Sequence, residues 1–163
     1  MAVKLITLLL APATLFAQST VTLKEQATLM SNALVSGDYT TFLQYFYPKI
    51  LALEGGKEKM LKELNDSDKQ MKAMGAVFLG ATIGEPGKFY KAGDEIHCLV
   101  PQTLRVKTSM KNSTFHGYLL AASGDGGKNW TFIRITKASI PQIPKLFPNF
   151  NKGLKIPEPT SPM

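Results

Sequence analysis

The first third of the chain carries apolar residues at helical spacing. Four of them follow one another at intervals of four, three and four residues: Leu23, Ala27, Met30 and Leu34. Thr22-Leu23-Lys24-Glu25 has the form of a capping box, in which a hydroxyl and a carboxylate satisfy amides at a helix start. Gly37 suits the position after the last turn. The pattern predicts a first helix that begins at Thr22 and ends before Gly37.

Two more helices are expected before residue 75. Asp38 is a typical N-cap, and six large apolar residues follow it: Tyr39, Phe42, Leu43, Tyr45, Phe46 and Tyr47. So many aromatic side chains predict a helix that lies against the main core until Pro48 ends or kinks it. Gly55-Gly56 breaks the chain again, and 57–73 has an amphipathic helical pattern. The polar run 65–68 favours turns, but the apolar phase continues across it, which favours one continuous helix.

From Gly75 onward the apolar pattern changes to a period of two. Turn residues separate five extended runs, which we expect to form strands: 76–83, 88–90, 94–108, 115–122 and 130–135. Short links between consecutive runs indicate an antiparallel meander. In the longest run, Cys98 and Val100 alternate with His97 and Leu99, so both faces of the sheet are partly apolar. The chain as a whole predicts an α+β fold, with N-terminal helices packed on a curved antiparallel sheet.

Residues 137–163 form a proline-rich tail. They hold six of the ten prolines, which excludes an inner strand of the sheet. The tail either wraps over the domain or extends to a partner. Wrapping is favoured because its apolar residues are spaced as if to be buried: Ile143, Leu146, Phe147 and Ile156. Residues 158–163 are expected to be loose.

Residues 1–17 have the pattern of a signal peptide. Lys4 precedes an uncharged apolar stretch that is shorter than the roughly 20 residues needed to span a membrane. A cut after Ala17 would leave Gln18 as the first residue of an exported chain, either periplasmic or extracellular. A retained N-terminal anchor helix is the alternative, which Pro12 and the short length disfavour. Residues 20–136 are then expected to form one domain before the tail.

Composition narrows the possible partners. Without Lys4, 18 basic residues face 12 acidic ones, and the lysines are scattered, which favours a solvated basic surface or contact with an anionic envelope surface. Two arginines, Arg105 and Arg134, with no basic stripe interleaved with aromatics, argue against nucleic-acid binding. The single Cys98 cannot form an internal disulfide. It is expected as a small apolar strand residue, with pairing to another chain as the lesser alternative.

Candidate chemistry is limited to two histidines and two tyrosines. His97 and His116 lie in predicted strands and are the candidates for acid or base catalysis in an apolar cavity. Tyr45 or Tyr47 could present a hydroxyl to the same cavity, although aromatic residues at helical spacing usually fill a core.

Other kinds of site find little support. Asp94 and Glu95 follow turn residues and are expected to be solvated. The histidines and the cysteine have no spacing known for a metal site. No phosphate-binding loop is indicated, because Gly124, Gly126 and Gly127 precede a strand and not a helix. We therefore expect neither a metal nor a cofactor.

The order of elements across roughly residues 20–136 resembles the cystatin-like cone of the nuclear transport factor two superfamily. Three stretches carry the resemblance: Ser36-Gly37-Asp38-Tyr39, Tyr47-Pro48-Lys49-Ile50 with Gly55-Gly56, and residues 123–135. The resemblance implies an exported bacterial member with a curved sheet around a helix and a conical cavity. Such cavities serve isomerase-like or dehydratase-like catalysis in some members and only ligand or partner binding in others, so the fold alone implies no activity.

A second resemblance is confined to one hairpin. Ser123-x-Asp125-x-Gly127-x-x-Trp130 is similar to the Asp-box of sialidases and other secreted carbohydrate-active proteins, but has Asn129 before the tryptophan. Physically it predicts a self-contained turn: the carboxylate accepts backbone amides, Gly127 adopts a left-handed conformation and the indole covers the hairpin. Because only one copy is present and no blade repeat is visible, a sialidase propeller is rejected.

These observations favour an exported, non-catalytic domain that binds a small apolar or amphipathic molecule or a protein partner. A homodimer formed through the sheet is possible because both strand faces are partly apolar. The alternative is an isomerase-like or dehydratase-like enzyme that uses a histidine of the cone as acid or base.

Overall fold

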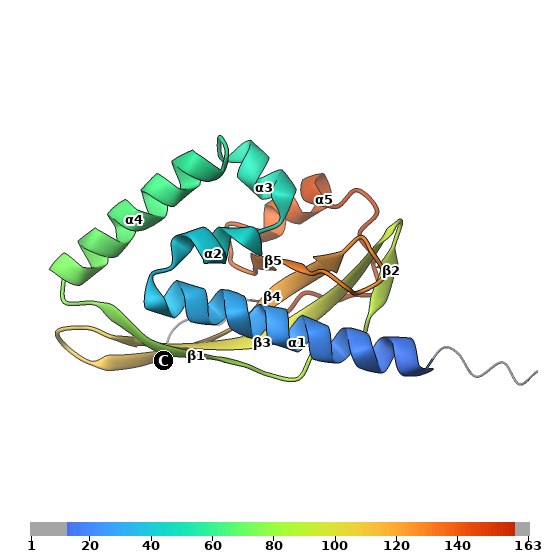
Figure 1. The fold of residues 1–163 in the computed structure, drawn as a ribbon, viewed down its shortest axis with the longest axis horizontal. Helices are drawn as coiled ribbons and strands as arrows, with labels where there is room; N and C mark the ends of the chain where they lie inside the picture. The colour runs from blue at the N-terminus through green and yellow to red at the C-terminus, as the bar shows by residue number, and fades with distance from the viewer. Residues whose placement is uncertain (1–12, 159–163) are drawn as a thin grey trace, which may run out of the picture.

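The structure, a computed structural model, describes residues 13–158 and the side chains from Ser19 onward. Most of the expected signal peptide and the end of the tail lie outside these residues. Helices precede the strands, and two short helices follow them: α1 Ala13–Ser36, α2 Tyr39–Gln44, α3 Pro48–Leu53, α4 Lys57–Ala73, β1 Val77–Ile83, β2 Tyr90–Ala92, β3 Glu95–Lys107, β4 Asn112–Ser123, β5 Thr131–Arg134, the 3-10 helix η1 Ile140–Gln142 and α5 Ile143–Leu146. The α+β class is confirmed, with N-terminal helices on a strongly curled antiparallel sheet (Figure 1).

The sheet is an antiparallel meander with one interrupted edge. Its strand order is β1-β3-β4-β5, and β2 also pairs with β3, beside 95–97, while β1 pairs beside 102–107. Between them, the amides of Gly84 and Gly87 donate to the carbonyls of Pro101 and Leu99, each at 2.9 Å. Pro86 lacks an amide hydrogen, which suits an edge position where pairing lapses. β1 and β2 therefore act as one broken edge strand.

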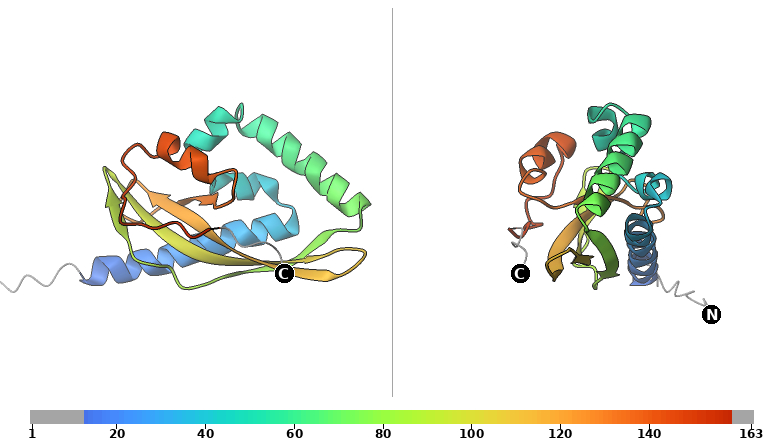
Figure 2. Two further views of the ribbon diagram at one scale, coloured as in Figure 1. Left: turned by 180° about the vertical axis from the view of Figure 1, so that it is seen from behind. Right: turned by 90° about the vertical axis from the view of Figure 1, so that its left-hand side faces the viewer.

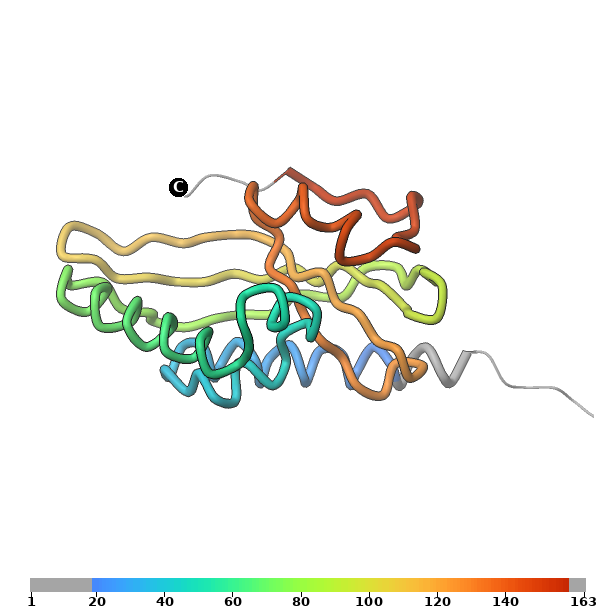
Figure 3. Tube along the Cα trace, turned by 90° about the horizontal axis from the view of Figure 1, so that it is seen from above, coloured from blue at the N-terminus to red at the C-terminus, as the bar shows by residue number. Residues whose placement is uncertain are grey.

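The sheet separates two apolar cores. Residues such as Leu23, Leu43, Cys98 and Phe132 form the core beneath α1 and α2. The core on the other face joins Leu120 and Ile133 to the tail residues Ile143, Leu146 and Phe147. Figures 2 and 3 show α1 and α2 on one side of the strands and the tail on the other. The side chains of Cys98 and His97 consequently lie on opposite faces, as strand alternation predicts.

The first helix starts earlier than its predicted cap. α1 begins at Ala13, so Thr22 lies inside the helix and the predicted capping box is wrong. Residues 13–21 contain neither glycine nor proline, so nothing stops the helix before Thr22 and it continues through them. Its predicted end is confirmed, because Gly37 has φ +77° and Asp38 caps α2 by accepting the Thr41 amide at 3.1 Å. Hydrogen bonding by the Thr41 side chain, and then by its amide, lowers the pKa of Asp38.

Pro48 opens a helix that the sequence reading missed. α2 ends at Gln44, and α3 starts at Pro48, because proline is tolerated in the first helical turn. The link between them runs beside β5, where the Phe132 amide donates to the Tyr45 carbonyl at 2.7 Å and the Tyr47 amide to the Phe132 carbonyl at 3.3 Å. The chain crosses the sheet edge here, so Tyr45 packs with the first core and Tyr47 with the second.

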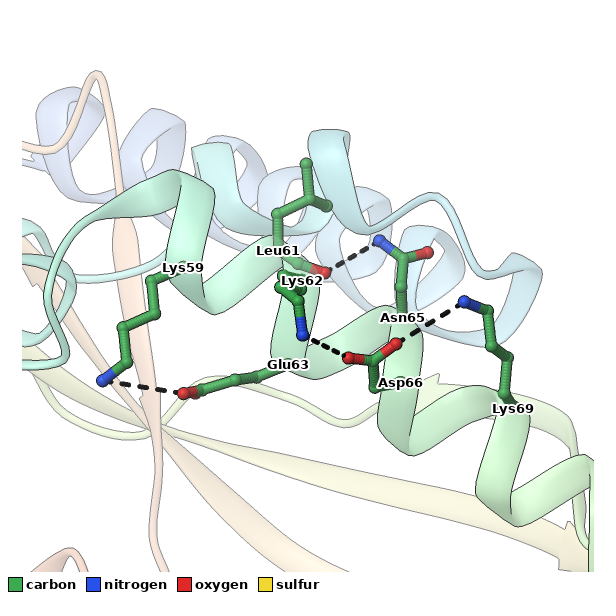
Figure 4. Close-up of polar contacts among 7 residues, drawn as sticks. All are labelled: Lys59, Leu61, Lys62, Glu63, Asn65, Asp66 and Lys69. Atoms are coloured by element: carbon green, nitrogen blue, oxygen red, sulfur yellow. Dashed lines mark hydrogen bonds and ion pairs between the residues drawn. The ribbon is translucent and has the colours of Figure 1, made fainter.

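The predicted helix over 57–73 is confirmed as one continuous element despite its polar centre. Figure 4 shows that Lys62 and Lys69 both pair with Asp66, at 2.9 and 3.5 Å, while the Asn65 amide bonds the Leu61 carbonyl at 2.8 Å. Such exposed pairs are individually weak, but they give the turn-favouring residues partners inside the helix.

The helices within residues 13–158 include none that could span a membrane, because each is too short or too polar.

Cys98 is a fully buried strand residue, whose thiol donates to the Gly87 carbonyl at 3.3 Å. Burial raises the pKa of this thiol to about 12, so it is unreactive near neutral pH.

Candidate functional site

The glycine-bearing hairpin between β4 and β5 is held by Asp125. Its Oδ1 atom accepts the amides of Lys128 and Asn129, at 3.1 and 2.9 Å, and the Ser123 hydroxyl at 2.9 Å. The Asn129 side chain donates to Oδ2 at 2.7 Å, so the departure from the usual Asp-box supplies one more bond. These bonds, led by the Asn129 amide, lower the pKa of Asp125 to about 2.

The rest of the motif also has a structural role. Gly127 adopts φ +90°, and its carbonyl accepts the indole N–H of the buried Trp130 at 3.0 Å. A Cβ atom at Gly127 would lie 2.4 Å from the Ser19 hydroxyl, so α1 rests directly on the turn. The predicted geometry of this hairpin is confirmed, and the carboxylate of Asp125 bonds only to groups of the turn itself.

A polar cluster with free hydrogen-bonding capacity lies at the end of the sheet, under the tail. Glu95, the first residue of β3, bridges two side chains through its two oxygens. The Tyr47 hydroxyl donates to Oε1 at 3.0 Å, and the His97 Nε2 atom lies 3.0 Å from Oε2. Glu95 and His97 share a face because they are two residues apart in a strand, while Tyr47 reaches them from the start of α3.

Aromatic rings from the tail cover this cluster. Phe147 packs on Tyr47 with ring centroids 4.4 Å apart and edge-on against His97 at 4.8 Å, and Phe150 also contacts the imidazole. A pocket of about 240 Å³ lies beside them, with Glu95, His97 and Phe147 in its wall. Lys49 lines the same pocket, and its ammonium donates to the Leu146 carbonyl at 3.1 Å. The site therefore combines the aromatic wall of Phe147 with two carboxylates, Asp94 and Glu95, and one cation, Lys49.

One nitrogen of His97 is buried without a partner. The residue is 1 % exposed, and its Nδ1 atom makes no hydrogen bond within the described part of the chain. In the neutral imidazole the nitrogen facing Glu95 carries the proton, because a carboxylate accepts and does not donate. Nδ1 is then an acceptor without a donor, which typically costs about 1–3 kcal/mol.

The Tyr47 hydroxyl is held in its neutral form. Burial first, and then the Glu95 carboxylate, raise the pKa of Tyr47 well above its usual value of 10.0. Tyr47 is consequently a permanent donor to Glu95 over the physiological range. It fixes one oxygen of the carboxylate, and the other oxygen orients the imidazole of His97.

The four predicted pocket residues do not gather in one place. Tyr47 and His97 meet through Glu95, whereas Tyr45 packs against the core beneath the helices. His116 is exposed, and its Nδ1 atom lies 3.0 Å from the Thr103 hydroxyl. Thr103 is six positions from His97 along β3, which corresponds to roughly 20 Å at the usual strand rise. His97 and His116 therefore belong to separate sites.

Glu95 is the functional residue that sequence reasoning missed. It was expected to be solvated near a turn, but its side chain is only 31 % exposed and binds both Tyr47 and His97. The turn is confined to Gly93-Asp94, and β3 begins at Glu95. Its spacing of two from His97 is the signal that could have placed both side chains on one strand face.

The described residues include no set of three His, Cys, Asp or Glu side chains close enough to share a metal ion. Glu95 and His97 lie 3.0 Å apart, a geometry suited to hydrogen bonding or proton transfer. In comparisons with known proteins, no family model, curated protein or solved structure matches this chain.

Proposed function

We propose that this protein is an exported, non-catalytic binding domain, related to the nuclear transport factor two superfamily, which holds a small apolar or amphipathic molecule at the Tyr47–Glu95–His97 cluster. Helices packed on a curled antiparallel sheet are compatible with the cone of that superfamily. Export is supported by the apolar pattern before Gln18. A chain cut there would keep Ser19 and Leu23, whose buried side chains join α1 to the rest of the domain.

The unpartnered His97 Nδ1 atom carries the proposal. Buried polar atoms in folded proteins nearly always have hydrogen-bond partners. The unpaired Nδ1 atom of His97, a residue of the pocket wall, is therefore expected to accept a hydrogen bond from a bound molecule. The neighbouring rings of Phe147 and Phe150 suit an apolar body. The ligand class is therefore an apolar molecule with one hydroxyl or N–H group.

Entry of this ligand requires movement of the tail. Phe147, Pro148 and Asn149 line the pocket beside His97, and the Nδ1 atom is closed off from solvent. A shift of this segment would open Nδ1 to the pocket and leave β3 in place. The tail thus serves as the cover of the site.

An NMR titration that monitors the ring-nitrogen resonances of the histidines tests the proposal. Phenol and cyclohexanol carry one donor each, and toluene carries none. We expect the two hydroxyl compounds to shift the nitrogen resonance of His97 and leave that of His116 unchanged, while toluene has a smaller effect on both. Equal responses to phenol and toluene, or none at His97, would rule out donor recognition by Nδ1.

Matched variants separate binding from folding. His97→Gln should abolish the phenol response, whereas His116→Gln, at an exposed position, should keep the affinity of the unmodified protein. Circular dichroism and the unfolding midpoint show whether each variant is folded. A folded His97→Gln variant that still binds phenol with full affinity contradicts the proposal.

One observation favours a second candidate, an isomerase-like or dehydratase-like enzyme. Glu95 orients the imidazole and leaves Nδ1 as a base that could take a proton from a carbon acid. The pair lies under the tail, on the face opposite α1 and α2. If this activity exists, Glu95→Gln and His97→Gln should each reduce turnover of a dienone or hydroxy-ketone by about 100-fold or more, as expected for loss of a general base. His116→Gln should not change it.

A further inference from the structure

Arg134 places a positive charge beneath the helices, on the face of the sheet opposite His97. It is the last residue of β5, and alternation puts its side chain on the same face as the buried Phe132. The guanidinium is partly buried, and this burial lowers the pKa of Arg134. Among the residues that the structure describes, no carboxylate forms an ion pair with it. A desolvated charge without a counterion is unfavourable, so a bound anion would stabilise the Arg134 guanidinium.

Two buried polar side chains fix the guanidinium in place. Nη1 of Arg134 donates to the Gln102 carbonyl oxygen at 2.9 Å, and the Gln102 amide donates to the Ser31 hydroxyl at 2.8 Å. Gln102 and Ser31 are 3 % and 1 % exposed, so this chain from β5 through β3 to α1 is shielded from water. The Nε and Nη2 atoms have no acceptor among the described residues and remain available as donors.

The surrounding strands supply no negative charge. Residues 96–124, which include nearly all of β3 and β4, contain no aspartate or glutamate. The neutral oxygen of Gln102 is the sole described acceptor of the guanidinium. These strands leave the charge of Arg134 without a negative partner, so a bound anion would complement it.

The residues beside Arg134 on this face are first a glycine and then two apolar side chains, the buried Leu104 and the half-buried Phe115. Gly117 faces Gln102 across the β3–β4 ladder, and a Cβ atom there would lie 3.7 Å from Nη2, so the glycine leaves that flank of the guanidinium uncovered. Leu104 and Phe115 form the pair two positions further along the same face, roughly 7 Å away. Anion-binding and apolar groups thus lie next to each other.

We propose that Arg134 binds the carboxylate of an amphipathic ligand, whose apolar part lies over Leu104 and Phe115. The free Nε–Nη2 edge of an arginine matches the two oxygens of a carboxylate, with two parallel charge-assisted hydrogen bonds. Gln102 and Ser31 hold the fork in position before the ligand arrives. This site is independent of the His97 pocket, because the sheet separates the two.

Calorimetric titration with sodium octanoate tests this assignment, with octanol as the neutral probe of equal chain length. We expect octanoate to bind and octanol to bind at least about tenfold more weakly, since it lacks the charge. Arg134→Leu should weaken octanoate binding by a similar factor. Arg134→Lys should retain only part of the affinity, because an ammonium has the charge without the planar fork.

Three further variants, at Arg105, Gly117 and His97, test the specificity of this binding. Arg105→Leu removes an equal charge from an exposed position on the other face of β3 and should leave octanoate binding unchanged. Gly117→Ala meets only ordinary contacts, so the domain should fold normally while the added methyl group weakens binding. His97→Gln should bind octanoate like the unmodified protein, which separates this test from that of the proposed function.

Three results would overturn the assignment. The first is no octanoate binding at millimolar concentration, and the second is undiminished binding by a folded Arg134→Leu variant. The third is competition by sodium sulfate at concentrations equal to those of octanoate, since a site that takes any anion equally well does not use Leu104 and Phe115.

Discussion

Gln26 and Trp130 are joined across 104 residues of sequence. The Trp130 amide donates to the Gln26 side-chain oxygen at 2.7 Å, and the Gln26 side-chain amide donates to the Lys128 carbonyl at 3.0 Å. One side chain of α1 therefore pairs with the backbone of the hairpin much as a neighbouring strand would. Together with the contact of Ser19 on Gly127, this pairing fastens the first helix to the last hairpin.

Replacement of Gln26 should loosen this junction. Gln26→Ala removes both hydrogen bonds and leaves the partly buried Trp130 amide unsatisfied, so we expect a loss of about 2 kcal/mol in the free energy of unfolding. Urea denaturation followed by circular dichroism measures it. Glu25→Ala changes an exposed neighbour in the same helix and should cost less than about 0.5 kcal/mol. Equal effects of the two substitutions would contradict the proposed junction.

Three glycines of the hairpin should respond differently to alanine. Gly124 lacks both a positive φ and a nearby atom, so Gly124→Ala should be nearly neutral. Gly126 has φ +78° in open space, and its substitution should cost about 1 kcal/mol of backbone strain. Gly127→Ala adds a collision with Ser19 to the same strain and should cost clearly more. Thermal unfolding of the three variants gives the order.

A double substitution separates the two costs at Gly127. Ser19→Gly removes the side chain that a new methyl group would meet, so Ser19→Gly/Gly127→Ala should regain the part of the loss that is due to the collision. The strain of the left-handed backbone should remain. If the double variant is no more stable than Gly127→Ala, the contact between α1 and the turn has no energetic role.

Elements whose signals are local could be predicted from the sequence. Residues 57–73 form the predicted helix, Gly37 and Asp38 separate two helices, and the hairpin motif has the expected bonds, because each signal involves neighbours in the chain. The predicted cap at Thr22 failed for the same reason. A capping box can occur inside a helix when no glycine or proline precedes it, and the motif alone does not show this.

Apart from the Glu95–His97 pair, whose spacing of two is a local signal, the sites depend on contacts between residues distant in sequence. Tyr47 meets Glu95 only because the chain crosses the edge of β5, which also sends Tyr45 to the other core. Arg134, Gln102 and Ser31 come from three elements, and the last two are 71 residues apart. Sequence reasoning could name Tyr47 and His97 as candidates. It could not select Tyr47 from Tyr45, because the partner of Tyr47 is 48 residues away. For His97 against His116, the nearby Glu95 was the one local signal, and it was missed.

Acid should weaken the hairpin through Asp125. Its pKa is lowered from 3.8 to about 2 in the folded protein, so the bonds that it accepts stabilise the fold above pH 4 and are lost as the pH falls toward 2. Asp125→Asn should cost roughly 1 kcal/mol at pH 7, a modest value because the carboxylate is exposed and screened by water. The unfolding midpoints of both proteins, measured between pH 7 and pH 2, should converge at the acidic end.

The reference for this pH series is Asp94→Asn, which changes an exposed carboxylate outside the hairpin. It should leave the decline in stability between pH 4 and pH 2 intact, apart from effects common to all carboxylates. A constant gap between the unmodified protein and Asp125→Asn over the whole range would mean that the charge of Asp125 does not hold the turn.

Alkali should weaken the junction of Tyr47 and Glu95. The pKa of Tyr47 is raised in the folded protein by burial and then by the Glu95 carboxylate, so in the unfolded chain the phenol ionises first, near its usual value of 10.0. The hydroxyl therefore contributes fully to the free energy of unfolding below pH 10, and its contribution falls as the pH rises further.

At pH 7 Tyr47→Phe should cost about 1–3 kcal/mol of that free energy, because it removes a bond to a charged acceptor. In urea denaturation from pH 7 to about pH 11, this difference should shrink above pH 10. A difference that stays constant would show that the Tyr47 hydroxyl ionises alike in folded and unfolded protein, contrary to its burial beside a carboxylate.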